Sequence, residues 1–207
     1  MGIRVIVADD YPVIRRVLCD MLESHPDIKI IGDAGNGKDA IDRCLSLTPD
    51  VAIVDVHMPD LNGIEVTRQI VSQLPRVKVL ALSGDPDLQY VRGMLTAGAS
   101  GYVLKDFILE ELVSAVRTID KSGTYLSAKI KHEIISDFCD SIEHLTGLEE
   151  AVLHGLAEGK CICDIALDLQ LSPKMVYETS QSLVDKAVVS NVSDLAEYVI
   201  REGTNCI

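Results

Sequence analysis

The strongest constraint on the fold is a regular alternation of short apolar runs and helical periods through the first 121 residues. The runs have the length and composition of buried strands. They lie at residues 3–9, 28–35, 51–56, 78–83 and 101–105. The segments that follow them space apolar residues three or four apart, as helices with one apolar face do. This alternation predicts a doubly wound α/β domain with a five-stranded parallel sheet, since right-handed crossovers cover both faces.

A different pattern begins after residue 121. Residues 122–144 are expected to form a linker, partly helical because no glycine or proline follows Gly123 within it. From Leu145 onward the helical segments have no strand between them, and residues 145–207 are expected to form an all-α domain of four short helices. The last helix, at 193–202, has an apolar side that suits either a dimer face or the core.

Composition and charge narrow the class of protein. Hydrophobic residues make up 47% and charged residues 25%, which is typical of a globular chain. No apolar run is long enough to cross a membrane, and no secretory signal is recognisable. The six cysteines are scattered, so we expect reduced thiols and a cytoplasmic location. The net charge of −13 disfavours binding to the phosphate backbone of nucleic acids unless a local basic patch outweighs it.

Polar residues stand where four of the five predicted strands end. Asp9 and Asp10 follow the first strand, and Asp55 ends the third. Ser83 ends the fourth strand and Lys105 the fifth. Ligands of open parallel sheets bind beyond the carboxyl ends of the strands, so these side chains are expected to converge. The alternative, that the acids only cap the following helices, does not explain why four strand ends carry such groups.

The convergence of three acids predicts a cation site. Oxygen ligands with room for water suit Mg²⁺, which would bring a phosphate up to the carboxylates. Asp55 could then attack phosphorus and form an acyl phosphate. Lys105 would pair with the phosphoryl oxygens, and Ser83 would donate a hydrogen bond to one of them.

These residues resemble the receiver domain of two-component response regulators over residues 1–121. The resemblance rests on the Asp9-Asp10 pair, Asp55 in DVHMPDLNG, Ser83 in ALSG and Lys105 in GYVLK. It implies that Asp55 is the phosphoacceptor and that Ser83 and Lys105 sense the phosphoryl group. It also implies phosphorylation by a sensor histidine kinase or a small phosphodonor. Such a protein is no enzyme in the usual sense, although it catalyses its own phosphorylation and dephosphorylation.

The same resemblance implies the metal ligands and a switch residue. Asp10, Asp55 and the backbone carbonyl of His57 would bind Mg²⁺, and Asp9 would support the metal through water or hydrogen bonds. The His57 side chain is expected to face solvent. Tyr102 would be the aromatic switch residue, with simple packing in the core as the alternative reading.

Residues 145–207 resemble the LuxR-type helix-turn-helix domain of the NarL/FixJ response regulators, but several polar positions depart from the family pattern. Leu148 stands where LTxRExEVL has arginine, and Cys-Ile-Cys at 161–163 replaces the Ser-Asn-Lys of GxSNKEIA. In the recognition helix, Tyr177 and Thr179 replace a lysine and a histidine. The apolar skeleton of the motif is retained, while groups that would face phosphates are depleted.

The net charge of the C-terminal domain also predicts weaker DNA binding than is usual for helix-turn-helix domains. Residues 146–207 contain four basic residues against ten acidic ones, a net charge of −6, whereas DNA-binding modules present a basic face. Candidate DNA contacts come from side chains that can pair with phosphates or hydrogen-bond to bases. They are Lys174, Tyr177, Thr179, Gln181 and Lys186.

Three hypotheses for function remain open. The first is a regulator of transcription that forms a homodimer and binds promoter DNA when Asp55 is phosphorylated. The second is a response regulator whose output domain has lost DNA binding and acts through a protein partner. The third, constitutive DNA binding with a silent pocket, is disfavoured by the complete set of pocket residues.

Overall fold

The computed structural model describes residues 2–121, 124–141, 145–189 and 199–200. The chain divides into two compact units, Met1–Ser127 and Ala128–Ile207. Tyr125 and Leu126 thus group with the first unit, although the sequence places them in a linker. Where one functional domain ends and the next begins stays a prediction.

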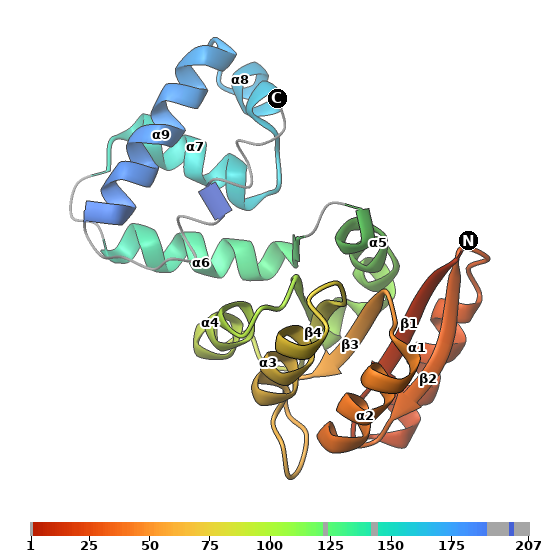
Figure 1. The fold of residues 1–207 in the computed structure, drawn as a ribbon. Coiled ribbons are helices and arrows are strands. Elements are labelled where there is room, and N and C mark those ends of the chain that lie inside the picture. Colours follow the sequence, from red (N-terminus) through yellow and green to blue (C-terminus); the bar gives the residue numbers. More distant parts are fainter. Residues whose placement is uncertain (1, 122–123, 142–144, 190–198, 201–207) are drawn as a thin grey trace. The chain divides into compact units, whose positions relative to one another are not determined.

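The first unit contains a six-stranded sheet in the order β2-β1-β3-β4-β5-β6, with all neighbours parallel (Figure 1). The strands are β1 Ile3–Ala8, β2 Ile28–Ala34, β3 Val51–Asp55, β4 Lys78–Ser83, β5 Gly101–Leu104 and β6 Tyr125–Leu126. The five expected strands and the doubly wound topology are confirmed. The edge strand β6 was not foreseen, because two residues are too few to show a period-2 pattern.

Helices cover both faces of this sheet. They are α1 Pro12–Glu23, α2 Gly37–Leu47, α3 Gly63–Gln73, α4 Leu88–Thr96 and α5 Ile108–Lys121, with a 3₁₀ turn η1 at Lys105–Phe107. One core joins α1 and α5 to the sheet, and a second core joins α2 and α3 to the opposite face. The middle strand β3 is buried along its whole length, which explains its unbroken apolar run.

In the second unit the described residues form helices joined by short turns, without a strand. Its helices are α6 Ala128–Ser141, α7 Gly147–Ala157, α8 Ile162–Asp168 and α9 Pro173–Val189. A capping box starts α7. The Thr146 side chain accepts a hydrogen bond from the backbone N–H of Glu149, and the Glu149 carboxylate accepts one from the backbone N–H of Thr146. Three of the four expected helices are therefore present. The fourth, at 193–202, lies outside the described residues except for two helical positions, 199 and 200.

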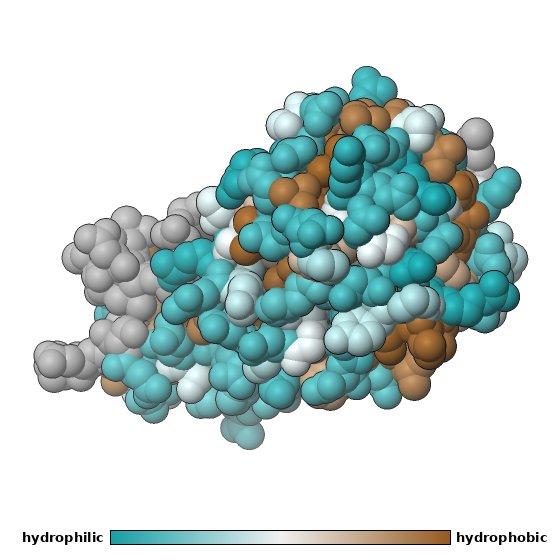
Figure 2. Space-filling model, turned by 90° about the horizontal axis from the view of Figure 1, so that it is seen from below, coloured by the Kyte–Doolittle hydropathy of each residue, from teal (hydrophilic) through white to brown (hydrophobic). Residues whose placement is uncertain are grey.

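The surface drawn in Figure 2 is mainly hydrophilic, with hydrophobic residues in smaller groups between the polar ones. In the described part of the chain, every helix is too short or too polar to cross a bilayer.

Candidate functional site

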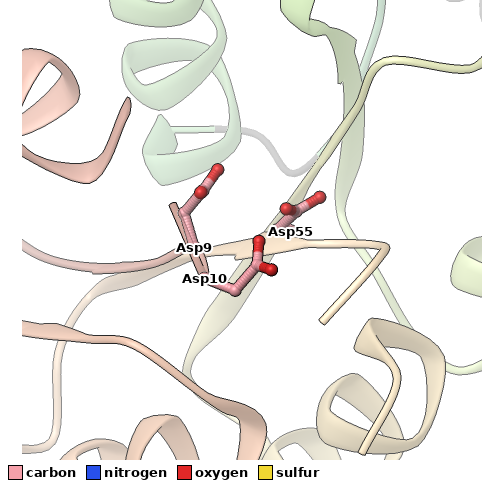
Figure 3. Close-up of side chains that lie close together, drawn as sticks. All are labelled: Asp9, Asp10 and Asp55. Carbon is pink, nitrogen blue, oxygen red and sulfur yellow. The ribbon is translucent and has the colours of Figure 1, made fainter. Parts of the chain in front are cut away.

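Three carboxylates meet at the carboxyl edge of the sheet. Asp9 and Asp10 follow β1, and Asp55 is the last residue of β3, the strand next to β1. Each contributes one oxygen to a group in which all the oxygens lie within 4.8 Å of one another (Figure 3). Asp9 and Asp55 are buried, with exposed fractions of 0% and 2%. The structure therefore brings together the acids that the strand ends predicted.

The close approach of α3 helps to fix Asp55. Gly63 is the first residue of α3, and a Cβ at this position would overlap the main-chain carbonyl oxygen of Asp55. The Gly63 backbone N–H donates to the carbonyl of Val56 at 3.0 Å. Any larger residue at position 63 would push the helix away from the strand end that carries the phosphoacceptor candidate.

Lys105 neutralises two of the three acids. Its ammonium nitrogen lies 2.8 Å from Asp9 Oδ2 and 2.7 Å from Asp55 Oδ2. Burial lowers the pKa of Lys105, but the hydrogen bonds to Asp55 and Asp9 outweigh burial and raise it. For Asp55, burial raises the pKa, and the contact with Lys105 offsets this only in part. A further cation beside Asp55 would favour its ionised form.

Asp10 is the acid with an unsatisfied oxygen. Its Oδ1 atom is buried and has no hydrogen-bond partner within the described part of the structure. Buried polar atoms are rarely left without a partner, and each such atom needs an explanation. An oxygen of this kind beside two other carboxylates suits a hard divalent cation, which prefers oxygen ligands. The residues present therefore fit a metal site.

Ser83 and Tyr102 both contact the segment that follows β4. The Ser83 hydroxyl accepts a hydrogen bond from the backbone N–H of Asp85 at 3.0 Å. The Tyr102 hydroxyl donates to the main-chain carbonyl of Asp85 at 3.1 Å. Both side chains are fully buried, and burial raises the pKa of Tyr102 to about 12. Tyr102 is thus packed in the core and also bonded to the loop before α4.

His57 contacts a residue that the sequence did not indicate. Its backbone N–H donates to Asp55 Oδ1 at 3.2 Å, while its side chain is exposed, as expected. The His57 ring meets the Tyr90 ring of α4 edge to face, with 4.6 Å between the ring centroids. Both rings line a cavity of about 410 Å³ beside Asp10. No spacing in the sequence relates Tyr90 to the pocket.

Three lysines of the second unit, at positions 160, 174 and 186, are paired with acids. Lys174 lies 3.7 Å from Glu178 on the exposed surface of α9. Lys186 lies 2.7 Å from Glu149, a buried carboxylate of α7, so a phosphate would have to compete with that pair. Lys160, before α8, lies within 2.8 Å of two acids, Glu158 and Asp168. The charge on each of these lysines is locally compensated.

The uncharged DNA-contact candidates differ in how far they are available. Tyr177 and Gln181 are exposed on α9. Thr179 is half-buried, and its hydroxyl donates to the carbonyl of Met175 within the helix at 2.9 Å. Of these three side chains, Tyr177 and Gln181 therefore offer the freer polar groups. Their role in binding DNA stays a prediction.

Comparison with known proteins gives matches over one or both units. Residues 5–117 match the family model described as the response regulator receiver domain. The transcriptional regulatory protein LiaR of Bacillus subtilis is 32% identical over 205 residues, which cover 96% of this chain and 97% of LiaR. The DNA-binding transcriptional activator DevR/DosR of Mycobacterium tuberculosis is 33% identical over 192 residues, 89% of this chain and 88% of that protein.

Solved structures of RcsB share the fold over almost the whole chain. The Salmonella typhimurium RcsB response regulator aligns with a TM-score of 0.61 and 24% identity, covering 97% of both chains. A structure of two RcsB dimers bound to two parallel DNAs aligns with a TM-score of 0.61 and 22% identity, covering 98% of this chain and 99% of that chain.

Proposed function

Because this chain belongs to the response regulators that carry a receiver domain, we propose that it is a phosphorylation-controlled regulator of transcription in a two-component system. The observation that carries the proposal is the cluster of Asp9, Asp10 and Asp55 with Lys105 bridging two of them. This arrangement provides a nucleophilic carboxylate, oxygen ligands for a cation and a positive charge for phosphoryl oxygens.

In the proposed reaction, an oxygen of Asp55 attacks the phosphorus of a phosphodonor. The bond from phosphorus to the donor's leaving group breaks, and an acyl phosphate remains on Asp55. Asp10, Asp55 and the backbone carbonyl of His57 would hold Mg²⁺, and Asp9 would support them through water or hydrogen bonds. When bound, Mg²⁺ supplies positive charge that offsets the repulsion between carboxylate and phosphate.

Lys105 and Ser83 would respond to the new phosphoryl group. The Lys105 ammonium can turn from Asp55 to a phosphoryl oxygen while it keeps its contact with Asp9. The Ser83 hydroxyl, which accepts from the Asp85 backbone, would donate its own proton to another phosphoryl oxygen. Because Tyr102 also holds Asp85, a shift of this segment would reach α4 and alter the surface next to it.

Phosphodonors would be a sensor histidine kinase or a small phosphorylated compound. The chain itself would catalyse phosphoryl transfer onto Asp55 and later hydrolysis of the acyl phosphate, without being an enzyme in the usual sense. The first step uses Asp55 as nucleophile, and the second requires water to reach the phosphorus beside the exposed His57 side chain.

The output would be control of transcription through the second unit, with dimerisation on phosphorylation. The names of LiaR and DevR/DosR support this output, and the RcsB dimers on DNA show that a protein of this fold can bind DNA as a dimer. One observation favours a protein partner instead: the lysines at 160, 174 and 186 are all paired with acids. The relatives favour DNA, and the charges imply that its binding is weak.

The test of the proposed function is phosphorylation of the purified chain. Acetyl phosphate with Mg²⁺ should add the mass of one phosphoryl group to the wild type and none to Asp55→Asn. Equal labelling of the two proteins would show that Asp55 is not the acceptor. A wild type that takes no label from acetyl phosphate, phosphoramidate or a phosphorylated histidine kinase would contradict the proposal as a whole.

A further inference from the structure

Arg15 of α1 makes two polar contacts at the strand ends behind the acidic cluster. Its Nε donates to Asp33 Oδ2 of β2 at 2.7 Å, and its NH1 donates to the main-chain carbonyl of Asp9 at 2.7 Å. The guanidinium lies against Gly35, where a Cβ would be 3.4 Å from NH1. The Arg15 side chain is only 18% exposed. An arginine held in this way joins α1 to the ends of two neighbouring strands.

The next residue provides a natural comparison. Arg16 is also on α1, but its side chain is 78% exposed. It forms an ion pair at 3.0 Å with Asp20, one turn along the same helix. The two neighbours therefore share charge, residue type and helix, but only Arg15 reaches the backbone of the acidic loop.

The carbonyl of Asp9 belongs to the peptide group that leads into Asp10. A hydrogen bond to this oxygen restrains the plane of that peptide and hence the direction in which the Asp10 side chain leaves the backbone. The Oδ1 atom of Asp10 has no partner of its own within the described residues. Its placement beside Asp55 therefore depends on the backbone, and Arg15 is one of the groups that fix that backbone.

We propose that Arg15 is a positioning residue for the metal site, which holds Asp10 ready to bind Mg²⁺ by fixing the Asp9–Asp10 peptide. This inference rests on the proposed function, since it assumes that the acidic cluster takes Mg²⁺. Electrostatics alone gives the opposite expectation. Removing a positive charge near three carboxylates would strengthen cation binding, whereas loss of positioning would weaken it.

The test is calorimetric titration of the full chain with MgCl₂, a suitable method because the chain has no tryptophan. Arg15→Met should raise the Kd for Mg²⁺ about tenfold, the low end of the usual effect of groups that orient metal ligands. Arg16→Met, which removes the same charge from the same helix, should bind Mg²⁺ as the wild type does. Arg15→Lys keeps the charge but lacks the planar guanidinium that reaches both Asp33 and the Asp9 carbonyl. Its affinity for Mg²⁺ should therefore lie between those of Arg15→Met and Arg16→Met.

A second readout separates positioning from a general loss of structure. The Mg²⁺ concentration for half-maximal phosphorylation by acetyl phosphate should rise in Arg15→Met by the same factor as the Kd. The rate at saturating Mg²⁺ should stay near that of the wild type. A merely structural role would instead lower the amount of active protein and leave the half-saturation point unchanged.

The Mg²⁺ affinities of these variants decide whether Arg15 positions the metal site. Wild-type or tighter Mg²⁺ binding by Arg15→Met would overturn the inference, and so would equal weakening by Arg16→Met. If Arg15→Met does not fold, Arg15→Lys decides the question: weaker binding at unchanged net charge supports positioning, and wild-type affinity overturns it. If the wild type binds Mg²⁺ and accepts a phosphoryl group, and the Arg15 variants bind Mg²⁺ equally well, this inference alone is refuted. A wild type that does neither would refute the proposed function as well.

Discussion

At the scale of single residues, the three acids of the cluster are not equivalent. Asp9 is engaged by Lys105 at 2.8 Å and accepts from the backbone N–H of Tyr11 at 2.8 Å. Asp55 is engaged by Lys105 and by the backbone of His57. Asp10 alone of the three has a buried oxygen without a partner in the described structure. A cation would therefore satisfy Asp10 without breaking an existing contact of that oxygen.

Mg²⁺ binding should accordingly depend more on Asp10 than on Asp9. Asp10→Ala removes a direct oxygen ligand, so we expect its affinity for Mg²⁺ to fall by at least about tenfold. Asp9→Asn keeps an oxygen in place and should have a milder effect. Calorimetric titration of both variants and the wild type with MgCl₂ measures this order. Equal affinity in Asp10→Ala and the wild type would contradict the assignment of Asp10 as a ligand.

Only some of the site residues could be predicted from the sequence, because the prediction depends on where the strands end. Asp9, Asp10 and Asp55 could be grouped because parallel strands end at one edge, so strand order alone brings them together. Arg15 could not be identified, because an arginine on a helix with one apolar face is usually solvated. Its role depends on the distance from α1 to two strand ends, which no local pattern encodes. The same holds for Tyr90 of α4, which meets His57 across the pocket.

At the scale of elements, the ends of helices set the positions of functional groups. The junction of β3 and α3 shows this: Asn62 caps α3 by accepting from the backbone N–H of Glu65 at 2.9 Å, and Gly63 then lies against the Asp55 carbonyl. The strands and helices were predictable from apolar periodicity, whereas the edge strand β6 was too short to be recognised.

Replacing Gly63 should disturb this junction. In Gly63→Ala, the new methyl group would overlap main-chain atoms of Asp55 and Val56 rather than a movable side chain. We expect a loss of about 1–3 kcal/mol in the free energy of unfolding and a lower rate of Asp55 phosphorylation. Chemical denaturation and a phosphorylation assay measure the two effects. Gly147→Ala is the control, because a Cβ at position 147 meets no atom within 4 Å beyond its chain neighbours and its own helix backbone.

The pair of Glu149 and Lys186 ties α7 to α9 and should make the second unit sensitive to acid. Burial raises the pKa of Glu149, but hydrogen bonds from Lys186 and Thr146 outweigh burial and lower it to about 2. In the unfolded chain the carboxyl should titrate near the ordinary value of about 4.3. A depressed pKa in the folded state stabilises the protein above pH 4.3, and this stabilisation is lost as the pH falls towards 2.

Hydrogen exchange of the α7 and α9 amides should detect this dependence. We expect protection to decrease between about pH 4 and pH 2 after correction for the intrinsic exchange rate. Lys186→Met should reduce protection at neutral pH by leaving the buried Glu149 carboxylate uncompensated. Lys174→Met is the matched control, since its pair with Glu178 is exposed and 3.7 Å long. Equal protection in both variants at neutral pH would show that the Glu149 pair contributes little.

At the scale of the whole molecule, phosphorylation should change assembly. Ser83 and Tyr102 hold the same segment before α4, so a phosphoryl group that draws Ser83 away must also alter the surroundings of Tyr102. A switch of this kind shifts a population only as far as its contacts differ between the two states. Light scattering with and without beryllofluoride should show a larger mass in the modified protein, with Asp55→Asn as control. An unchanged mass at every protein concentration would count against dimerisation.

DNA binding by the second unit should be weak, because Lys160, Lys174 and Lys186 are already paired with acids. Of the charged groups on α9, Lys174 faces Glu178 and Lys186 faces the buried Glu149, while Asp185 is exposed. Few phosphates can then be neutralised, and each missing phosphate contact lowers affinity and flattens its dependence on salt. Binding that does occur should depend on Tyr177 and Gln181 and on dimerisation, which doubles the number of contacts.

Replacing the acids of α9 with lysine should strengthen DNA binding. Glu178→Lys with Asp185→Lys frees Lys174 from its partner and adds two basic groups, so affinity for duplex DNA should rise. With up to three further phosphate contacts, the plot of log K against log salt should steepen by about 2 to 3. Glu23→Lys with Asp42→Lys, at exposed positions of α1 and α2, changes the net charge equally and should leave the slope near that of the wild type. Fluorescence anisotropy with labelled duplexes across a salt series measures both quantities. Tight binding and a steep slope in the unmodified wild type would show that its paired lysines exchange their acids for phosphates readily, and that the charge of this unit does not limit DNA binding.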